Sequence, residues 1–323
     1  MIDADTRGMR PRIDPAALRV MMRVDARASL AALAFDWGTI ASAIAFAETV
    51  SHPLAYIAAV VVIGARQHGL GVMMHEGAHL GLHKRRALND LIGELLAAWP
   101  LFISMRGYRA HHNDHHRHLN SERDPDFRYR TEEDGRPRDE FQFPMPPARL
   151  AWLLGKDLLG FGLLRMLGTL KRIVASDSGA KAKRERSASD RALDRTRIVF
   201  YAALIVILTV TGGWRGFALY WLVPLFTWLS MVTRLRGIAE HWGLGGRVGT
   251  RTTLCSWLEG FLLAPHNIGY HADHHLFPAV RFYALPELHR VLAGRGVFTG
   301  KKSFRRTQGY VGVFRECTRP RKR

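Results

Sequence analysis

Long apolar runs alternate along the chain with stretches rich in arginine. Residues 29–50 and 53–74 are almost wholly apolar, and only the short link 49–52 separates them. A helix needs about 20 apolar residues to cross the hydrocarbon core of a bilayer, so each run is long enough to span. The short link leaves room only for a tight turn. The pattern therefore predicts a hairpin of two transmembrane helices.

A second pair of apolar runs lies in the C-terminal half. Residues 198–211 and 217–233 flank a glycine-rich turn from Gly212 to Gly216. Both runs are somewhat short, and we predict that they also span the membrane. Four crossings then place both termini and the long middle region on one side of the bilayer.

The distribution of lysine and arginine predicts which side that is. The two turns on the opposite side contain one basic residue, Arg215, whereas the common side receives Lys84–Arg86, the segment 171–197 and the segment 301–323. Basic residues gather on the cytoplasmic side of membrane proteins, so both termini and the middle region are expected in the cytoplasm. The alternative, a soluble all-α protein with these runs in its core, does not explain this asymmetry.

Shorter segments fill the middle of the chain. Residues 91–103 are too few to span and are interrupted by Pro100, which predicts a buried or half-inserted helix. Residues 148–172 are apolar with sparse charges and predict one helix lying on the bilayer surface. Residues 173–197, rich in Ser, Ala, Lys and Arg, are expected to form a solvated connector or surface helix.

The expected fold is an all-α integral membrane protein. It has four transmembrane helices in two hairpins, with a cytoplasmic helical cap that holds the histidine clusters described below. The expected parts are a cytoplasmic N-terminal segment (1–28), a membrane domain (29–292) and a basic C-terminal tail (293–323).

Composition narrows the function classes. A net charge of +19 suits either nucleic acid or anionic lipid headgroups, and the apolar runs favour lipid. Only two cysteines occur, Cys255 and Cys317, and they form no CxxC pair, which argues against a disulfide framework, an iron–sulfur cluster or a cysteine zinc site. The excess of arginine over lysine suggests a bacterial source, so the expected location is the bacterial inner membrane.

Eight of the 16 histidines stand in three tight clusters. The clusters are His75 to His79 (HEGAH), His112 to His116 (HNDHH) and His271 to His275 (HADHH). On a helix, residues at i, i+3 and i+4 share one side, while adjacent rings diverge, which suits two metals better than one. A metal also removes the cost of protonating crowded imidazoles, because it takes their neutral lone pairs.

Other residues near the clusters are weaker candidates. His241, in the segment RGIAEH after the fourth run, is a ninth candidate ligand because its position brings it to the same membrane face. Three further histidines are less favoured: His83, His111 and His118. The acids within the clusters are expected either to orient ligand imidazoles or to be solvated; they are Glu76, Asp114 and Asp273. The remaining histidines considered are interpreted as packed or hydrogen-bonded side chains: His52, His68, His266 and His289.

Together the three clusters resemble the histidine boxes of the membrane fatty-acid desaturase and hydroxylase superfamily. The flanking residues strengthen the likeness, which covers about residues 29–292: Tyr108-Arg109, Asn120, Asp124-Pro125-Asp126, Leu276-Phe277-Pro278 and Leu285 to His289. The resemblance implies two iron ions on the cytoplasmic side. Its iron ligands would be His75, His79, His112, His115, His116, His241, His271, His274 and His275. Some relatives have an asparagine that binds the metal through a water, and Gly237 stands at that position here. A water-bridged ligand at position 237 is therefore in doubt, and Asn267 is a possible substitute for it.

The resemblance also implies an activity, O2-dependent desaturation of an acyl lipid. Two electrons per turnover would come from a separate ferredoxin- or cytochrome-type donor with its reductase, and a basic cytoplasmic face suits an acidic donor. A hydroxylase or ketolase acting on lipid or carotenoid would use the same scaffold. HEGAH also fits the HExxH pattern of zinc proteases, but a protease would leave the two HxxHH clusters without a role. A metal transporter should carry its ligands along the membrane path rather than at one end.

Overall fold

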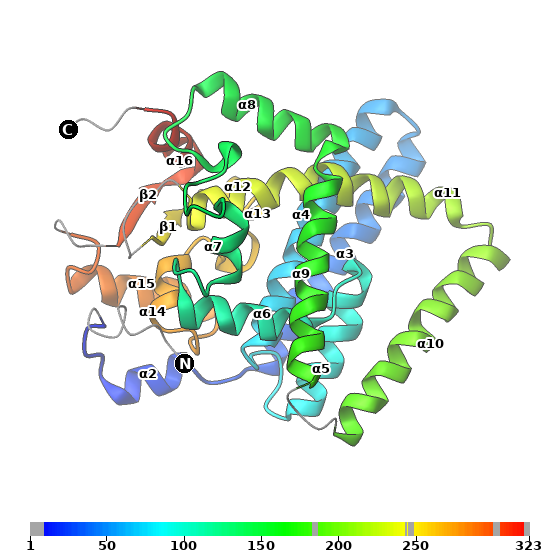
Figure 1. Ribbon diagram of the computed structural model, residues 1–323. Helices are drawn as coiled ribbons and strands as arrows, with labels where there is room; N and C mark the ends of the chain where they lie inside the picture. Colours follow the sequence, from blue (N-terminus) through cyan, green and yellow to red (C-terminus); the bar gives the residue numbers. More distant parts are fainter. Residues whose placement is uncertain (1–9, 183–186, 243, 245–248, 300–303, 320–323) are drawn as a thin grey trace. The chain divides into compact units, whose positions relative to one another are not determined.

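A computed structural model describes residues 10–182, 187–242, 244, 249–299 and 304–319 (Figure 1). Each of its two compact units is assembled from segments that are distant in the sequence. The first, here called the histidine unit, comprises Met1–Val24, His111–Lys156 and Val232–Arg323. The second, the hairpin unit, comprises Asp25–Ala110 and Asp157–Met231.

The first predicted hairpin is present as two long helices of the hairpin unit. Helix α3 (Ala26–Val50) ends at Ser51, whose φ of 48° reverses the chain. The side chain of His52 then caps α4 (Pro53–Ala78), and Pro53 takes the first helical position, where its missing N–H costs nothing. Because α4 extends beyond the apolar run, it carries His75 in its last turn.

The predicted short helix at 91–103 is irregular and buried. It consists of α5 (Arg86–Gly93), the π-helix η1 (Glu94–Ala98) and the 3-10 helix η2 (Trp99–Leu101). The side chains of Ala97, Ala98 and Trp99 are at most 1% exposed, so this part of the segment is buried, whereas half-insertion into the membrane stays a prediction. Helix α6 (Met105–His118) follows and carries the second histidine cluster.

The single surface helix predicted for residues 148–172 is wrong. The chain forms α8 (Pro147–Lys156), the π-helical turn η4 (Asp157–Phe161) and α9 (Leu163–Ala182). The break falls at Gly160, whose φ of 88° lies in the left-handed region that a helix excludes and glycine tolerates. Part of the predicted connector continues as α9, and residues 183–186 lie outside the described residues.

The second hairpin begins with α10 (Ala188–Val210). The predicted turn 212–216 is shorter than expected, because Gly212 reverses the chain at φ 66° and the helix restarts at Trp214. The second arm comprises α11 (Trp214–Phe217), the π-helices η5 (Ala218–Leu222) and η6 (Leu225–Leu229), and α12 (Ser230–Glu240).

Among the described residues, three helical stretches are long and apolar enough to cross a membrane: Pro15–Val50, Pro53–Ala78 and Trp214–Glu240. A bent pair, Arg86–Leu101 with Met105–His118, makes a fourth if it is one span. The expected span 198–211 lies in α10, which is not among them because its first half is rich in charged residues. The chain thus has three or four candidate spans.

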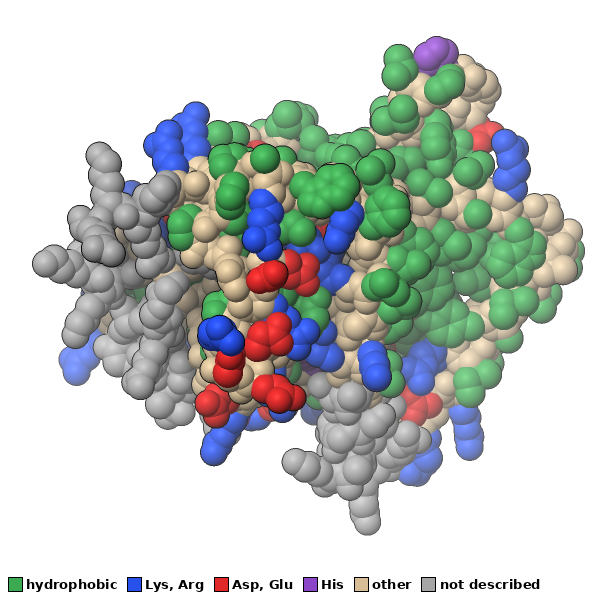
Figure 2. All heavy atoms as spheres, turned by 45° about the horizontal axis from the view of Figure 1, so that its top comes forward, with side chains coloured by type: hydrophobic (Ala, Val, Ile, Leu, Met, Phe, Trp, Pro, Cys, Tyr) green, Lys and Arg blue, Asp and Glu red, His purple; other side chains and the backbone are tan. Residues whose placement is uncertain are grey.

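Large apolar side chains remain exposed on helices of the hairpin unit. On α10 no residue is buried, and Ile198, Val199 and Val206 are each at least 59% exposed. Phe35 and Phe46 of α3 are more than half exposed as well. Figure 2 shows hydrophobic side chains gathered over a broad area of the face it draws. An apolar surface of this kind is rare in soluble monomers and suits contact with lipid.

The histidine unit is built from short elements. In chain order they are α2 (Pro15–Met21), α7 (Pro125–Arg130), η3 (Asp139–Phe141), α8, β1 (Arg251–Leu254), α13 (Trp257–Leu262), η7 (Pro265–Asn267), α14 (His271–Leu276), η8 (Phe282–Ala284), α15 (Leu285–Gly294), β2 (Arg305–Gln308) and α16 (Gly309–Thr318). Its apolar core includes the fully buried side chains of Ala272, Leu276, Leu288 and Leu292.

A small sheet in this unit was not predicted. Strands β1 and β2 pair in parallel, with Arg251 opposite Arg305. Part of the predicted basic tail is therefore folded, and α16 buries Tyr310, Val313 and Cys317 at helical spacing. The chain is mostly helical, as expected, but four-residue strands separated by about 50 positions leave no periodic signal in the sequence.

A buried ion pair links the two helices of the first hairpin. Arg66 of α4 lies 3.0 Å from Asp36 of α3, and the two side chains are 2% and 0% exposed. The helices approach closely because position 69 is glycine: a Cβ there would lie 2.6 Å from both carboxylate oxygens of Asp36. The acid in the middle of the first apolar run is thus neutralised inside the hairpin.

We expect Asp36→Ala to lower the free energy of unfolding by about 3–5 kcal/mol, because it leaves the Arg66 charge buried without its carboxylate. The double variant Asp36→Leu with Arg66→Met removes both charges and should recover much of that loss. Thermal unfolding of the purified protein in detergent measures both. Equal instability of the single and double variants would show that the pair is not the cause.

Candidate metal centre

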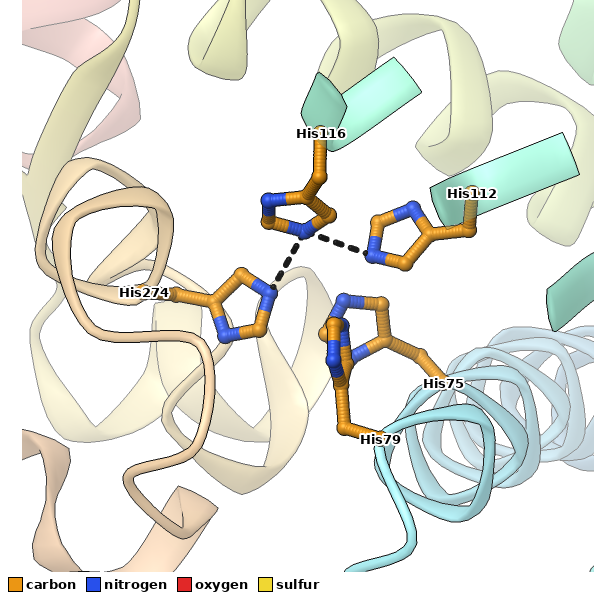
Figure 3. A group of neighbouring side chains, drawn as sticks. All are labelled: His75, His79, His112, His116 and His274. Carbon is orange, nitrogen blue, oxygen red and sulfur yellow. Dashed lines mark hydrogen bonds between the residues drawn. The ribbon is translucent and has the colours of Figure 1, made fainter. Parts of the chain in front are cut away.

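Three histidines of the histidine unit converge on one point, here called the first group. His112 and His116 stand one turn apart on α6, and His274 comes from α14. The Nε2 atom of His116 lies 2.9 Å from Nε2 of His112 and 3.1 Å from Nε2 of His274 (Figure 3). All three side chains are at least 94% buried.

Four more histidines form a second group in the same unit. His115 comes from α6, His241 follows the end of α12, and His271 and His275 stand one turn apart on α14. Their Nε2 atoms also face one another, at 3.2 Å for His115 and His241, 2.7 Å for His241 and His271, and 3.0 Å for His271 and His275.

Adjacent histidines divide between the two groups. On α6, His115 joins the second group while His116 joins the first, and on α14 His274 joins the first group while His275 joins the second. The cause is helical geometry, since neighbouring side chains on a helix point about 100° apart. Each HxxHH cluster therefore contributes to both groups, as the spacing predicted for two metals.

The chemistry of these nitrogens fits a shared cation. Nδ1 of His115 lies 3.0 Å from a carboxylate oxygen of Asp124, and Nδ1 of His241 lies 3.1 Å from the carbonyl oxygen of Gly249. Acceptors at Nδ1 place the ring protons there and leave lone pairs on both Nε2 atoms. Two lone pairs 3.2 Å apart repel unless a metal ion or a proton lies between them. Two nitrogens each about 2.1 Å from one metal, at a right angle, would be about 3.0 Å apart.

The electrostatics of the site favour neutral rings at positions 241 and 271. At His115 burial acts in the same direction, but the charge and hydrogen bond of Asp124 outweigh it and raise the pKa of that ring. Burial lowers the pKa of His241 well below its ordinary value, and the positive charge of neighbouring His115 acts in the same direction. Burial, helped by His275 and His241, likewise lowers the pKa of His271. Neutral imidazole is the form that binds metals, so His241 and His271 are in the protonation state that a metal site requires.

Asp124 is the acid that holds His115. Burial by itself would raise the pKa of this carboxyl group. The charge and hydrogen bond of His115, together with the backbone N–H groups of Asn120 and Asp126, outweigh burial and hold the pKa well below its ordinary value. Asp124 is therefore an ionised, fully buried acceptor for the Nδ1–H of His115.

Sequence reasoning missed the groups that orient these rings. Asp124 entered only as a flanking residue of the resemblance, and Glu240, whose Oε1 lies 3.4 Å from Nδ1 of His271, was given no role. For Asp114 the structure agrees with the solvated alternative, because this acid is exposed and pairs with Arg117. The available signals were the Asp-Pro helix start at residues 124–125 and the acid directly before His241.

The first histidine cluster lies in the hairpin unit. His75 occupies the last turn of α4 and His79 follows its end, with their ring centres 4.9 Å apart (Figure 3). Arg109 of α6 donates to the carbonyl oxygens of Gly77 and Ala78 and pairs with Asp90. The guanidinium thus binds two carbonyls at the helix end, and Asn89 also donates to that of Gly77, so these contacts fix the segment between the two rings.

The weaker candidates have other partners. His111 is buried and lies 3.2 Å from Asp126, and Nδ1 of His83 accepts the backbone N–H of Arg85. Among the histidines interpreted as packed or hydrogen-bonded, His52 caps α4 and His289 binds Asp273. None of these four belongs to the groups of converging rings found among the described residues.

We expect Asp124→Ala to weaken metal binding about 10- to 100-fold, because His115 loses the acceptor that fixes its ring and its proton. Competition with a coloured chelator measures the affinity of the purified protein. Glu122→Gln, two positions away on the exposed surface, is the matched control and should bind like the parent protein. An unchanged affinity in Asp124→Ala would contradict this role.

Comparison with known proteins places this site in a family. The model of the fatty acid desaturase family matches residues 51–301. The chain is 28% identical to dihydrorhizobitoxine desaturase of Bradyrhizobium elkanii, over 80% of this chain and 73% of that protein. It is 26% identical to an sn-1 oleoyl-lipid 12-desaturase of Anabaena variabilis (72% and 66% covered) and 25% identical to one of Synechocystis (75% and 69% covered).

The family match covers most of the chain, including all three histidine clusters, and the candidate spans agree with a membrane protein. All three of these relatives are named as desaturases, which implies an oxidoreductase. This chain is a membrane oxidoreductase that belongs to the fatty acid desaturase family.

Proposed function

We propose that the chain is an O2-dependent acyl-lipid desaturase that works with two iron ions held by nine histidines. The observation that carries this proposal is the pair of buried histidine groups whose Nε2 atoms face one another, in a chain of the desaturase family. Each group presents at least three imidazole nitrogens, which suit iron, copper and zinc alike. Family membership favours iron among these metals.

The proposed ligand sets follow the groups. His112, His116 and His274 hold the first iron, and the pattern of the family's boxes adds His75 and His79 to this set. His115, His241, His271 and His275 hold the second iron. Asp124 fixes the ring of His115 by accepting at Nδ1, which keeps its Nε2 lone pair directed at the metal. Glu240 lies 3.4 Å from Nδ1 of His271 and makes no hydrogen bond with it.

Bound iron would supply the activation of O2 that breaks an unactivated C–H bond of the substrate. The chain's own residues hold the ligands neutral, fix their orientation and exclude water, since all seven histidines of the two groups except His241 are at least 94% buried. Each turnover also needs two electrons from outside. The basic surface of the chain suits an acidic ferredoxin- or cytochrome-type donor served by its own reductase.

The proposed topology has four membrane crossings, with the histidines and both termini on the cytoplasmic side of a bacterial inner membrane. The basic segments on the common side and the single Arg215 opposite support it. In this arrangement α10 supplies the third crossing, and its exposed apolar side chains contact lipid.

Desaturation is favoured over hydroxylation or ketolation because the relatives from Bradyrhizobium, Anabaena and Synechocystis are all named as desaturases. Two of them are named for an oleoyl lipid, which supports an acyl lipid as the substrate class. An HExxH protease is disfavoured because all six histidines of the HxxHH clusters join the two groups, and a protease would have no use for them.

The test is lipid profiling by mass spectrometry in a host that expresses the chain together with a ferredoxin and its reductase. We expect acyl chains that have lost two mass units, and purified protein that carries two irons. His115→Ala should abolish the product, because it removes a donor from the second group. His118→Ala, one turn or less away on the same helix but outside both groups, should retain it. A gain of sixteen mass units in the acyl chains would show that the enzyme is a hydroxylase. Purified protein that contains zinc and no iron would reject both the desaturase and the hydroxylase.

A further inference from the structure

The third histidine cluster contains a buried acid that does not face the converging rings. Asp273 lies on α14 between His271 and His274, and it is fully buried. One carboxylate oxygen lies 3.0 Å from Nδ1 of His289, and the other accepts a hydrogen bond of 2.5 Å from the hydroxyl of Thr252. Both oxygens are therefore held by side chains from outside α14.

Helix α14 is poorly fixed by its own sequence. It has six residues, and no side chain caps its N-terminus. A helix this short is unstable alone, so contacts with the rest of the unit must set its position. Apolar packing of Ala272 and Leu276 fixes its depth in the core but, being non-directional, constrains its rotation only weakly.

The rotation of α14 matters because the helix serves both groups. His274 points to the first group, whereas His271 and His275 point to the second. A small rotation about the helix axis would move all three Nε2 atoms away from their partners at once. A directional contact at position 273, between these residues, opposes such a rotation.

The partners of Asp273 lie on two well-anchored elements. Thr252 is in β1, which pairs with β2, and His289 lies in α15, packed between the rings of Tyr270 and Phe298. The chain before α14 is also tied to β1, because the N–H of Thr253 donates to the carbonyl oxygen of Gly269. Two residues before β1, the carbonyl oxygen of Gly249 accepts from His241. The segment 249–253 therefore contacts both His241 and the chain just before α14.

We propose that Asp273, held by His289 and Thr252, is a positioning residue that sets the orientation of α14 and thereby the geometry of both metals. The proposal rests on the metal centre described above. The proposal applies to Asp273 alone. Its counterpart Asp114 occupies the same place in the second cluster but is exposed and pairs with Arg117. Two clusters of the same pattern thus use their central acid differently.

The test uses pairs of variants that differ only in the donor to Asp273. Thr252→Val removes the hydroxyl at constant size, and Thr252→Ser keeps it. His289→Leu removes the N–H, and His289→Asn keeps a donor close to the position of Nδ1. Asp273→Ala removes the acid itself, and Asp114→Ala is the matched control from the second cluster.

The readouts are iron content, affinity in a chelator competition, and the visible spectrum of the cobalt-substituted protein, which reports ligand geometry without turnover. We expect Thr252→Val, His289→Leu and Asp273→Ala to bind metal about tenfold more weakly or worse, with an altered cobalt spectrum. Thr252→Ser, His289→Asn and Asp114→Ala should match the parent. Circular dichroism and gel filtration in detergent check that each variant is folded.

Parent-like affinity and spectrum in Thr252→Val and His289→Leu would overturn the positioning role. So would equal losses in the Ser and Val variants at position 252, because these share only the altered packing. Should Asp273→Ala fail to fold, the two matched pairs still decide the question. A parent protein that binds no metal would reject the metal centre itself, and this inference with it.

Discussion

The crowding of uncharged imidazole nitrogens in a water-poor interior is the constraint on which the rest of the histidine unit depends. Five pairs of Nε2 atoms lie between 2.7 and 3.2 Å apart. Protonated rings would repel one another at this distance, and rings with facing lone pairs would too. Burial, which lowers the pKa of His241 and His271, selects the neutral form, and that form is stable in such a cluster only with cations to share.

The surrounding polar groups serve the same constraint. Asp124 and the carbonyl of Gly249 each lie within hydrogen-bond distance of the Nδ1 atom of a ring whose Nε2 faces the centre. Because an imidazole has only two nitrogens, an acceptor on one fixes which is left to bind a metal. Asp273 contacts no ring of the two groups, and in our proposal it acts by orienting α14, the helix that carries three of them. The buried acids of this unit therefore act by orientation.

The hairpin unit has a different constraint, because its polar groups must find hydrogen-bond partners in apolar surroundings. Its long helices satisfy their own backbone groups, as any segment in lipid must. The polar side chains inside it are paired, as Asp36 is with Arg66, or bound to carbonyls, as Arg109 is at the end of α4. The same helix end carries His75 in its last turn and is followed directly by His79.

By itself the sequence determined the periodic features: the first hairpin, the helical placement of both HxxHH clusters and the division of their adjacent rings, because helical spacing repeats every few residues and is visible locally. Only the tertiary structure decided the break at Gly160, the early restart at Trp214, the pairing of β1 with β2 and the partners of Asp124, Glu240 and Asp273. The breaks depend on single backbone angles. The pairings join residues up to about 50 positions apart, and no local pattern records which distant side chain a buried acid will meet.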